Sequence, residues 1–293
     1  MHAPAIRPRS AIEIVDAAVS LFRDNFKTMA VIGLAGSVPI IAAIVAGVGM
    51  FGALADPQEF IKNPTAVVPG MIAFGVVMLF WMAVVDGALT FAAAEAYHGR
   101  KPSPADAFRG AMGKGMALVG GNLLRMLIVG GLVGIAAGAV AIAASANGFI
   151  AFIIAVGVIV LMAHLLARTF AITSAIVIED QSATEGVSRS FFLSKDATMR
   201  IVGIAMLCLF IYGAVQGIGS ALVQMVVTLL LRSPIVAMAI GNLVTMIVYP
   251  FLNIAIMVLY YDQRVRKEGY DLDVLTTAMP TSPISASAST PRS

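Results

Sequence analysis

The chain has 293 residues, of which 59% are hydrophobic and 12% are charged, and its mean hydropathy is +0.94. Soluble domains carry about a quarter charged residues, so this composition excludes an ordinary water-soluble protein and indicates a membrane protein. The formal charge of +3 does not indicate nucleic-acid binding, because basic residues in membrane proteins orient the loops. The single cysteine, Cys208, lies within an apolar run, so no disulfide can form within the chain.

Six apolar stretches, each longer than the ~20 residues that cross a bilayer, predict an all-α integral membrane protein. The expected spans are about 29–53, 70–95, 117–143, 149–177, 201–230 and 235–260. Pro250 is expected to kink the last span. No compact apolar signal segment comes before the first span, which is therefore expected to act as the insertion signal. Residues 1–275 would form the membrane domain, and residues 276–293 a disordered cytoplasmic tail rich in Ser, Thr, Ala and Pro.

A Ser-x-x-acidic pattern comes before each pair of spans. The serines are Ser10, Ser103 and Ser182, and the acidic residues three positions later are Glu13, Asp106 and Glu185. A serine oxygen can accept a hydrogen bond from a free backbone N–H while the carboxylate bonds back to the cap, so the pattern predicts three helix N-caps. We therefore expect three parallel repeats, at about 10–99, 103–180 and 182–268. Each would be a cytoplasmic amphipathic helix followed by a transmembrane hairpin.

The first of these amphipathic helices has the clearest pattern. Its apolar residues fall on one stripe, which consists of Ile12, Val15, Val19, Phe22 and Phe26. Charged and polar residues occupy the opposite stripe. This pattern is typical of a helix that lies in the plane of the membrane surface.

Small residues recur at intervals of four in the first span of each hairpin. They are Ala43 and Gly47 in the first span, Gly130, Gly134 and Gly138 in the third, and Gly213 and Gly217 in the fifth. Such spacing lets helix backbones approach closely, which predicts that the first spans of the three hairpins lie at the centre of the bundle. Glycine is also simply common in membrane helices, and that alternative stays open.

Lys and Arg residues lie almost entirely on one side of the expected topology. The amino terminus, the second and fourth connections and the tail hold fifteen of them: Arg7, Arg9, Arg23, Lys27, Arg100, Lys101, Arg109, Lys114, Arg189, Lys195, Arg200, Arg264, Arg266, Lys267 and Arg292. The other connections hold only Lys62 and Arg232. The positive-inside rule therefore places both termini in the cytoplasm.

Three charged residues, Asp86, Arg125 and Arg168, lie well inside the spans, together with His164. A charge inside the hydrocarbon costs at least ~2.5–3.5 kcal/mol and requires an explanation. Their positions along the spans allow one cluster in the cytoplasmic half of the membrane. It could be a structural ion pair of Asp86 with Arg125 or Arg168, or a proton or substrate site.

No catalytic, cofactor or metal motif is found. His164 cannot form a zinc site, because zinc needs three or four ligands and neither His2 nor His98 is suitably placed. The chain has no phosphate-binding loop, and nothing places Ser, His and Asp as a triad. These observations predict no enzymatic activity, no cofactor and no metal.

Two segments, Tyr260–Leu272 and Glu179–Leu193, resemble the glycerophosphoryl diester phosphodiesterase membrane-domain family of bacteria. The resemblance implies a six-span bundle of the bacterial cytoplasmic membrane that precedes a phosphodiesterase domain in some members. The present chain leaves no room for a catalytic barrel of ~250 residues, so that activity is not expected here.

Two main functions agree with these features. The first is a non-enzymatic protein that organises lipids or a partner protein through its cytoplasmic helices. The second is a transporter of a small solute or a lipid that uses the polar residues of the spans; a membrane enzyme ranks third. The basic stretch from Arg264 to Lys267 predicts either contact with anionic lipids or a charge-balanced helix end.

Overall fold

The computed structural model describes residues 7–45 and 64–270. In this part of the chain every regular element is a helix. In chain order they are α1 (Ala11–Asp24), α2 (Phe26–Ala35), α3 (Val38–Val45), α6 (Pro64–Tyr97), α7 (Pro104–Gly113), α8 (Gly115–Arg125), the π-helix η1 (Met126–Gly131), α9 (Leu132–Ala146), α10 (Gly148–Arg168), α11 (Ile172–Ile178), α12 (Ala183–Ser194), α13 (Thr198–Leu231), α14 (Pro234–Val248) and α15 (Pro250–Glu268).

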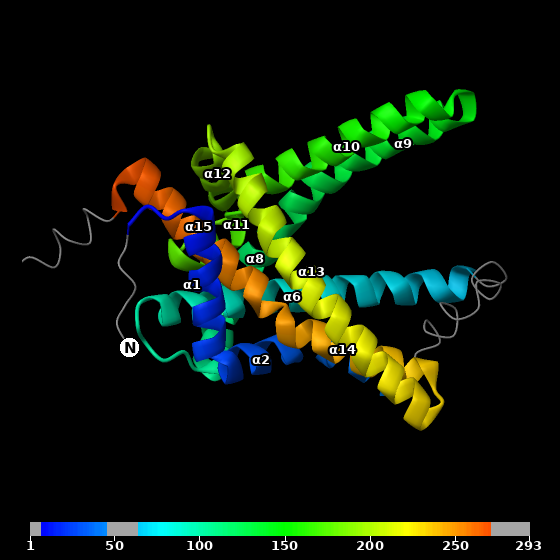
Figure 1. Cartoon of the computed structure of the whole chain (residues 1–293), viewed down its shortest axis with the longest axis horizontal. Helices are drawn as coiled ribbons and strands as arrows, with labels where there is room; N and C mark the ends of the chain where they lie inside the picture. Colours follow the sequence, from blue (N-terminus) through cyan, green and yellow to red (C-terminus); the bar gives the residue numbers. More distant parts are fainter. Residues whose placement is uncertain (1–6, 46–63, 271–293) are drawn as a thin grey trace, which may run out of the picture.

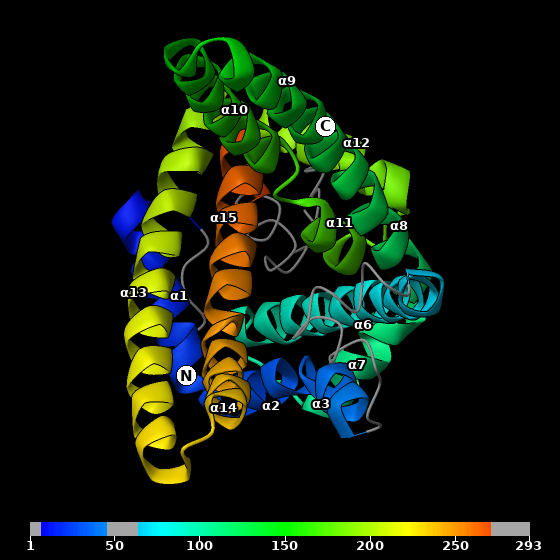
Figure 2. The same ribbon diagram turned by 90° about the vertical axis from the view of Figure 1, so that its right-hand side faces the viewer.

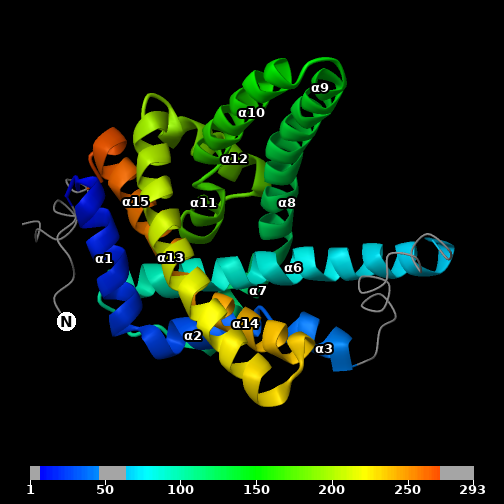
Figure 3. The ribbon, with the colours of Figure 1, turned by 45° about the vertical axis from the view of Figure 1, so that its right-hand side comes forward.

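The helices form a packed base from which three arms diverge (Figure 1, Figure 3). We define the base as α1, α7, α11 and α12 together with the parts of the long helices that pack against them. The first arm is the outer part of α6, the second is the hairpin of α9 and α10, and the third is the hairpin of α13 and α14. Seen from the side of the arms, α15 lies between α13 on one side and α8 and α11 on the other (Figure 2).

Within the described residues, five helical segments are long and apolar enough to cross a membrane: Val68–Tyr97, Gly115–Ser145, Gly148–Ile178, Thr198–Leu231 and Ile240–Glu268. They match the last five of the six expected spans. The expected first span begins with α2 and α3, which a turn at Gly36 and Ser37 separates, and its end at residues 46–53 lies outside the described residues. Six spans in three repeats therefore stay a prediction.

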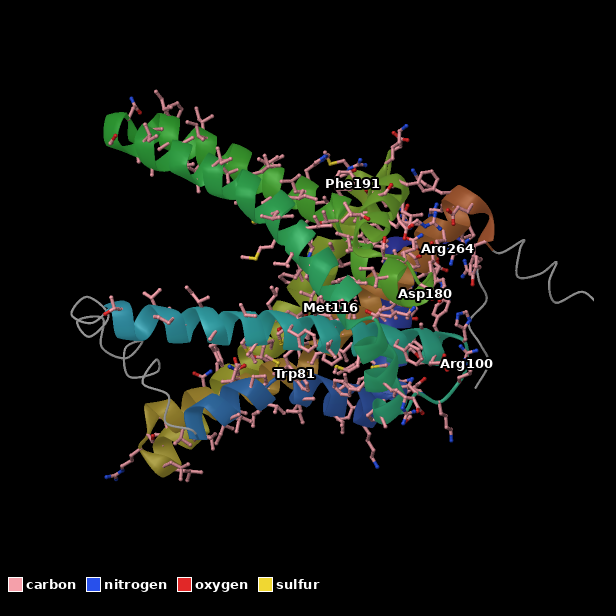
Figure 4. All side chains as sticks on the ribbon, turned by 180° about the vertical axis from the view of Figure 1, so that it is seen from behind. Trp81, Arg100, Met116, Asp180, Phe191 and Arg264 are labelled. Carbon is pink, nitrogen blue, oxygen red and sulfur yellow. The ribbon has the colours of Figure 1, made fainter. Side chains whose placement is uncertain are left out.

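Side chains made up mostly of carbon project from the arms (Figure 4). Ile72 of the first arm is 63% exposed, Phe152 of the second 66% and Phe210 of the third 76%. In water, each Å² of this exposed apolar surface would cost roughly 25 cal/mol of free energy. The arms therefore face lipid, and the chain is a multi-pass membrane protein.

Each short helix of the base packs against neighbouring helices. Helix α7 packs on α6, α12 packs on α11 and α8, and α1 packs on α15. In cyclic order, each short helix thus lies against the helix that ends the preceding hairpin. The contact of α1 with α15 joins the first and last described helices, and the buried side chains of Ile14 and Ala18 lie on the packed side of α1.

Two of the three expected caps are confirmed. Ser10 and Ser182 each accept a hydrogen bond from the backbone N–H three residues later, and the carboxylates of Glu13 and Glu185 bond back to the caps. Ser103 also comes directly before a helix, but its side chain makes no cap hydrogen bond, so the expectation of a capping box there is wrong. The carboxylate of Asp106, which would complete this box, is bonded to Arg109 instead.

The packing role expected of the glycines in the third and fifth spans is wrong, and Gly47 of the first span lies outside the described residues. No atom of a neighbouring element lies within 4 Å of the position that a Cβ would take at Gly134, Gly138, Gly213 or Gly217, and Gly130 meets only Met126 of its own helix, at 3.8 Å. Helices α9 and α13 therefore do not form the centre of the bundle. The centre is α15, whose Ile254, Met257 and Val258 are fully buried.

The kink expected at Pro250 is confirmed. Helix α14 ends at Val248 and α15 begins at Pro250, because proline lacks the N–H that would continue the helix. A Cβ on Gly33 of α2 would collide with the carbonyl oxygen of Met246 and lie 2.9 Å from the Pro250 ring. The kinked helix and α2 thus approach each other at a position that only glycine allows.

Candidate intramembrane site

A cavity of about 810 Å³ lies between α6 and the segment α8–η1 of the second arm. Three polar side chains line it, namely Asp86 from α6 and Asn122 and Arg125 from α8. The other lining residues are aliphatic residues, methionines and glycines. The cavity is therefore an apolar space with a small polar region.

A second cavity, of about 400 Å³, lies between α10 on one side and α13 and α15 on the other. Its walls are almost entirely apolar, and they include Met162, Ile204 and Leu252. Arg125 and Leu166 line both cavities. Arg125 therefore lies at the junction of the two spaces that separate the second arm from its neighbours.

A residue at the kink of the last span holds the side chain of Asp86 in place. The hydroxyl of Tyr249, the residue before Pro250, donates a hydrogen bond of 2.8 Å to Asp86 Oδ1. The next residue on α6 is Gly87, where a Cβ would lie 2.5 Å from Leu118 of α8. The carboxylate is thus positioned where α6, α8 and α15 meet.

Arg125 is the last residue of α8, and the π-helix η1 follows it directly. Its Nη2 donates to Asn122 Oδ1 at 2.5 Å. Among the residues that the structure describes, no carboxylate oxygen lies within 4.0 Å of an Arg125 nitrogen. The guanidinium is always protonated, so it is a cation without an ion-pair partner, beside a π-helical segment of the kind that is frequent at functional sites.

The structure brings together two of the four polar residues expected to form one cluster. Asp86 and Arg125 line the same cavity and interact electrostatically, but they do not form an ion pair. The side chain of Arg168 lies over the ring of Phe191 at 4.7 Å, in the base. His164 is exposed on α10. The expected pairing of Asp86 with Arg125 or Arg168 is thus replaced by its hydrogen bond to Tyr249.

The two charges lie at similar depths. Asp86 is eleven residues before Tyr97, and Arg125 is ten residues after Gly115, so both are ~15 Å from the base ends of their spans at 1.5 Å per residue. The span Val68–Tyr97 has 30 residues and a length of ~45 Å, whereas the hydrocarbon core is ~30 Å thick. A bilayer centred on these spans would place both charges in the half next to the base, roughly 7 Å inside its polar boundary.

A network of ion pairs in the base joins the two segments that carry the family resemblance. Arg189 of α12 bonds to Glu179 at the end of α11 and to Glu268 at the end of α15. Arg264 lies 3.3 Å from Glu268, and the hydroxyl of Tyr260 donates to Glu179. Burial opposes the charge of Arg189, but the hydrogen bonds to Glu268 and Glu179 raise its pKa above the usual value. Figure 4 shows Arg264 in the base, away from the arms.

A second network is centred on Asp262, whose side chain is fully buried. Its carboxylate accepts hydrogen bonds from the backbone N–H of Arg9 and from the guanidinium groups of Arg200 and Arg266. Both guanidinium groups also donate to the carbonyl oxygen of Arg9. Asp262 thus fixes the chain before α1 against α13 and α15, and the basic end of α15 is charge-balanced, one of the two alternatives expected for it.

Sequence reasoning missed both base networks as sites of interaction, because their members are far apart in the chain. The described residues hold no group of three or more His, Cys, Asp or Glu side chains that could bind a metal. The chain was compared with known proteins in three ways. A scan against protein-family models gave no match, and neither did searches of the curated proteins and of the solved structures.

Proposed function

We propose that this protein is a non-enzymatic membrane protein that holds lipid molecules between its arms. The observation that carries the proposal is Arg125, a cation that lines both apolar cavities and has no ion-pair partner in the part of the chain that the structure describes. Apolar walls favour acyl chains, whereas a guanidinium binds phosphate with two parallel hydrogen bonds. A membrane lipid combines these two properties in one molecule.

The depth of the site supports the same ligand. Arg125 lies near the polar boundary of the bilayer, where lipid head groups are found, and the exposed surfaces of the arms leave the cavities next to the surrounding lipid. A soluble ligand would have to pass between the packed helices of the base, where α7 lies against α6 and α12 lies against α8 and α11. A lipid needs only lateral movement within the membrane.

The proposal includes a location and an orientation. The base faces the cytoplasm of a bacterium, in agreement with the basic residues assigned to that side, and the arms cross the cytoplasmic membrane. The chain would contain six spans in three repeats and would belong to the glycerophosphoryl diester phosphodiesterase membrane-domain family. The exposed apolar side chains of Ile12, Val19 and Phe26 support a position of α1 at the membrane surface.

Transport of a lipid or small solute is the second candidate function. It is favoured by the contact of one residue, Arg125, with both cavities, because a ligand could pass from one cavity to the other along this side chain. It requires net flux across or along the membrane in reconstituted vesicles. Holding lipid requires only retention of lipid by the purified protein.

Native mass spectrometry of the protein released from nanodiscs tests the proposal. The variant Gly130→Phe places a ring in the 810 Å³ cavity, and Gly138→Phe is its matched control, because Gly138 lies one helix segment further out, does not line the cavity and has open space around it. We expect bound lipid in the wild type and in Gly138→Phe and a loss of lipid in Gly130→Phe. Equal lipid retention by all three proteins would overturn the proposal.

A further inference from the structure

The two charges in the 810 Å³ cavity have opposite signs but do not neutralise each other. Asp86 and Arg125 line the same cavity, and no nitrogen of Arg125 lies within 4.0 Å of the Asp86 carboxylate. Opposite charges in an apolar medium attract strongly and normally pair directly. Both side chains line a cavity of about 810 Å³, which has room for a ligand that carries both charges.

The hydrogen-bonding groups around the cavity are partly unused. Tyr249 donates to Oδ1 of Asp86 and the side chain of Asn253 also interacts with this carboxylate, whereas no direct hydrogen bond from Arg125 reaches it. Arg125 donates through Nη2 to Asn122, and no further hydrogen bond from its guanidinium occurs within residues 7–45 and 64–270. Asn122 accepts this bond through Oδ1, which leaves its amide NH₂ as a donor. An anionic group can therefore bind at Arg125 and Asn122, and a cationic group at Asp86.

We propose that the cavity binds a zwitterionic phospholipid with a primary ammonium, that is, a phosphoethanolamine head group with two acyl chains. Its phosphate would contact Arg125 and Asn122, its ammonium would donate to Asp86, and its chains would lie along the apolar walls. This inference rests on the proposed function and adds the class of lipid. A purely anionic lipid would contact Arg125 but would place negative charge near Asp86. A quaternary ammonium has no N–H to donate to the carboxylate.

The test is competition between lipid classes for the purified full-length protein. The protein is exchanged into nanodiscs with equal amounts of phosphatidylethanolamine, phosphatidylglycerol and phosphatidylcholine that have identical chains, and the retained lipids are counted by native mass spectrometry. We expect about tenfold enrichment of phosphatidylethanolamine over each competitor, the ratio that one charge-assisted hydrogen bond supports. Equal retention of phosphatidylethanolamine and phosphatidylglycerol would overturn the inference. Retention of no lipid at all would instead overturn the proposed function.

Two variants separate the contributions of the charges. In Asp86→Asn the side chain keeps its shape and its acceptor for Tyr249, and we expect the preference for phosphatidylethanolamine over phosphatidylglycerol to disappear while lipid is still retained. In Arg125→Gln we expect loss of both phospholipids. His164→Ala, on the exposed side of α10, is the matched control and should behave as wild type. An unchanged preference in Asp86→Asn would overturn the role of the carboxylate.

Two further measurements are needed. The first tests whether the Asp86 carboxylate or the fold around it determines the lipid preference, and the second tests whether the ligand is the whole lipid or its free head group. Tyr249→Phe removes the hydrogen bond to Asp86 but keeps the charge, so a lipid preference that persists in this variant shows that the carboxylate and not the fold determines it. Loss of the preference in Tyr249→Phe, with the fold intact, would contradict the inference. Soluble phosphoethanolamine has the same head group without chains, and we expect it not to displace the lipid. Displacement at millimolar concentration would show that the ligand is the free head group and not a lipid.

Discussion

Arg189 donates hydrogen bonds to both carboxylate oxygens of Glu268, which lies 79 residues later in the chain. This bidentate geometry is the strongest form of the arginine–carboxylate interaction. It fastens α12 to the end of α15, and because Arg189 also bonds to Glu179, it fixes the end of α11 as well. The Arg189 side chain thus joins three helices of the base: α12, which carries it, and the ends of α11 and α15.

We therefore expect Arg189→Ala to destabilise the base. Loss of one partner from a fully buried pair costs about 3–5 kcal/mol. The three side chains are between 16% and 24% exposed, so we expect about 2–3 kcal/mol after solvent screening. Thermal or denaturant unfolding in detergent measures the change. Arg109→Ala, which breaks an exposed pair with Asp106, is the control, and equal effects of the two variants would contradict the prediction.

Neutralising Asp262 should release the chain before α1. Asp262→Asn keeps the shape of the side chain but leaves two guanidinium groups without a carboxylate in a buried position. We expect amide hydrogen exchange in α1 to rise about tenfold or more, with little change in α9 and α10. Asp24→Asn removes an exposed pair from the same helix and should have little effect. Slow exchange in α1 of Asp262→Asn would show that its contact with α15 does not depend on this carboxylate.

Two glycine-to-alanine substitutions should have opposite effects. At Gly33 a methyl group collides with the backbone of Met246, so Gly33→Ala should cost about 1–3 kcal/mol through overpacking. At Gly213 the space is open, and alanine is favoured in a helix by up to about 1 kcal/mol. Unfolding midpoints of the two variants, measured in one detergent, should therefore lie on opposite sides of the wild-type value. A Gly33→Ala protein as stable as wild type would mean that α2 does not approach α14 so closely.

The capping box of α1 should make its first turn sensitive to acid. The backbone N–H of Ser10, followed by the Arg7 side chain, lowers the pKa of Glu13 from 4.5 to about 2. A carboxyl group whose pKa is lower in the folded state stabilises it above the unfolded value and loses this contribution as the pH falls through the folded value. The protection factors of amide exchange in the first turn of α1, taken relative to the unstructured chain at the same pH, should therefore fall between pH 4.5 and about 2.

The variant Glu13→Gln provides the reference for this titration. Glutamine can still accept the hydrogen bond from Ser10 but has no charge to lose, so the difference between the two proteins isolates the Glu13 carboxyl from other acidic groups. We expect that difference to be constant above pH 4.5 and to vanish near pH 2. A difference independent of pH would contradict the charged cap.

Much of the helical layout could be predicted from hydropathy. The expected spans 70–95 and 149–177 agree closely with Val68–Tyr97 and Gly148–Ile178, because the thickness of the bilayer fixes the length of an apolar helix. The caps at Ser10 and Ser182 were also predictable, since they depend only on neighbours within one helical turn. The same local pattern failed at Ser103, because Asp106 bonds to Arg109 instead of to the cap.

The glycine spacing failed because it states only that a helix can be approached closely. Whether a partner arrives depends on the whole fold, and at Gly134 and Gly138 none does among the described residues. The positions that are truly crowded, such as Gly87 and Gly121, have no regular spacing. They face Leu118 and Ile176, and nothing in the local sequence indicates these neighbours.

Prediction from the sequence was limited in a similar way for the polar residues of the spans. Distance along a span predicts depth, and Asp86 and Arg125 do lie at similar depths. It does not predict which side of the helix faces a cavity, and so it could not separate Arg125 from Arg168, which lies over Phe191. The contact of Tyr249 with Asp86 spans 163 residues and depends on the kink at Pro250.

The contact between α1 and α15 has a consequence for biosynthesis. Arg9 and Asp262 are 253 residues apart, so the ribosome makes α1 long before the surface of α15 on which it packs. Until α15 has been made, α1 lacks this partner, and the side chains of Ile14 and Ala18 cannot be buried against it. A chain that stops before α15 would therefore display an uncovered apolar helix, a feature by which quality control could distinguish it from a chain that contains α15.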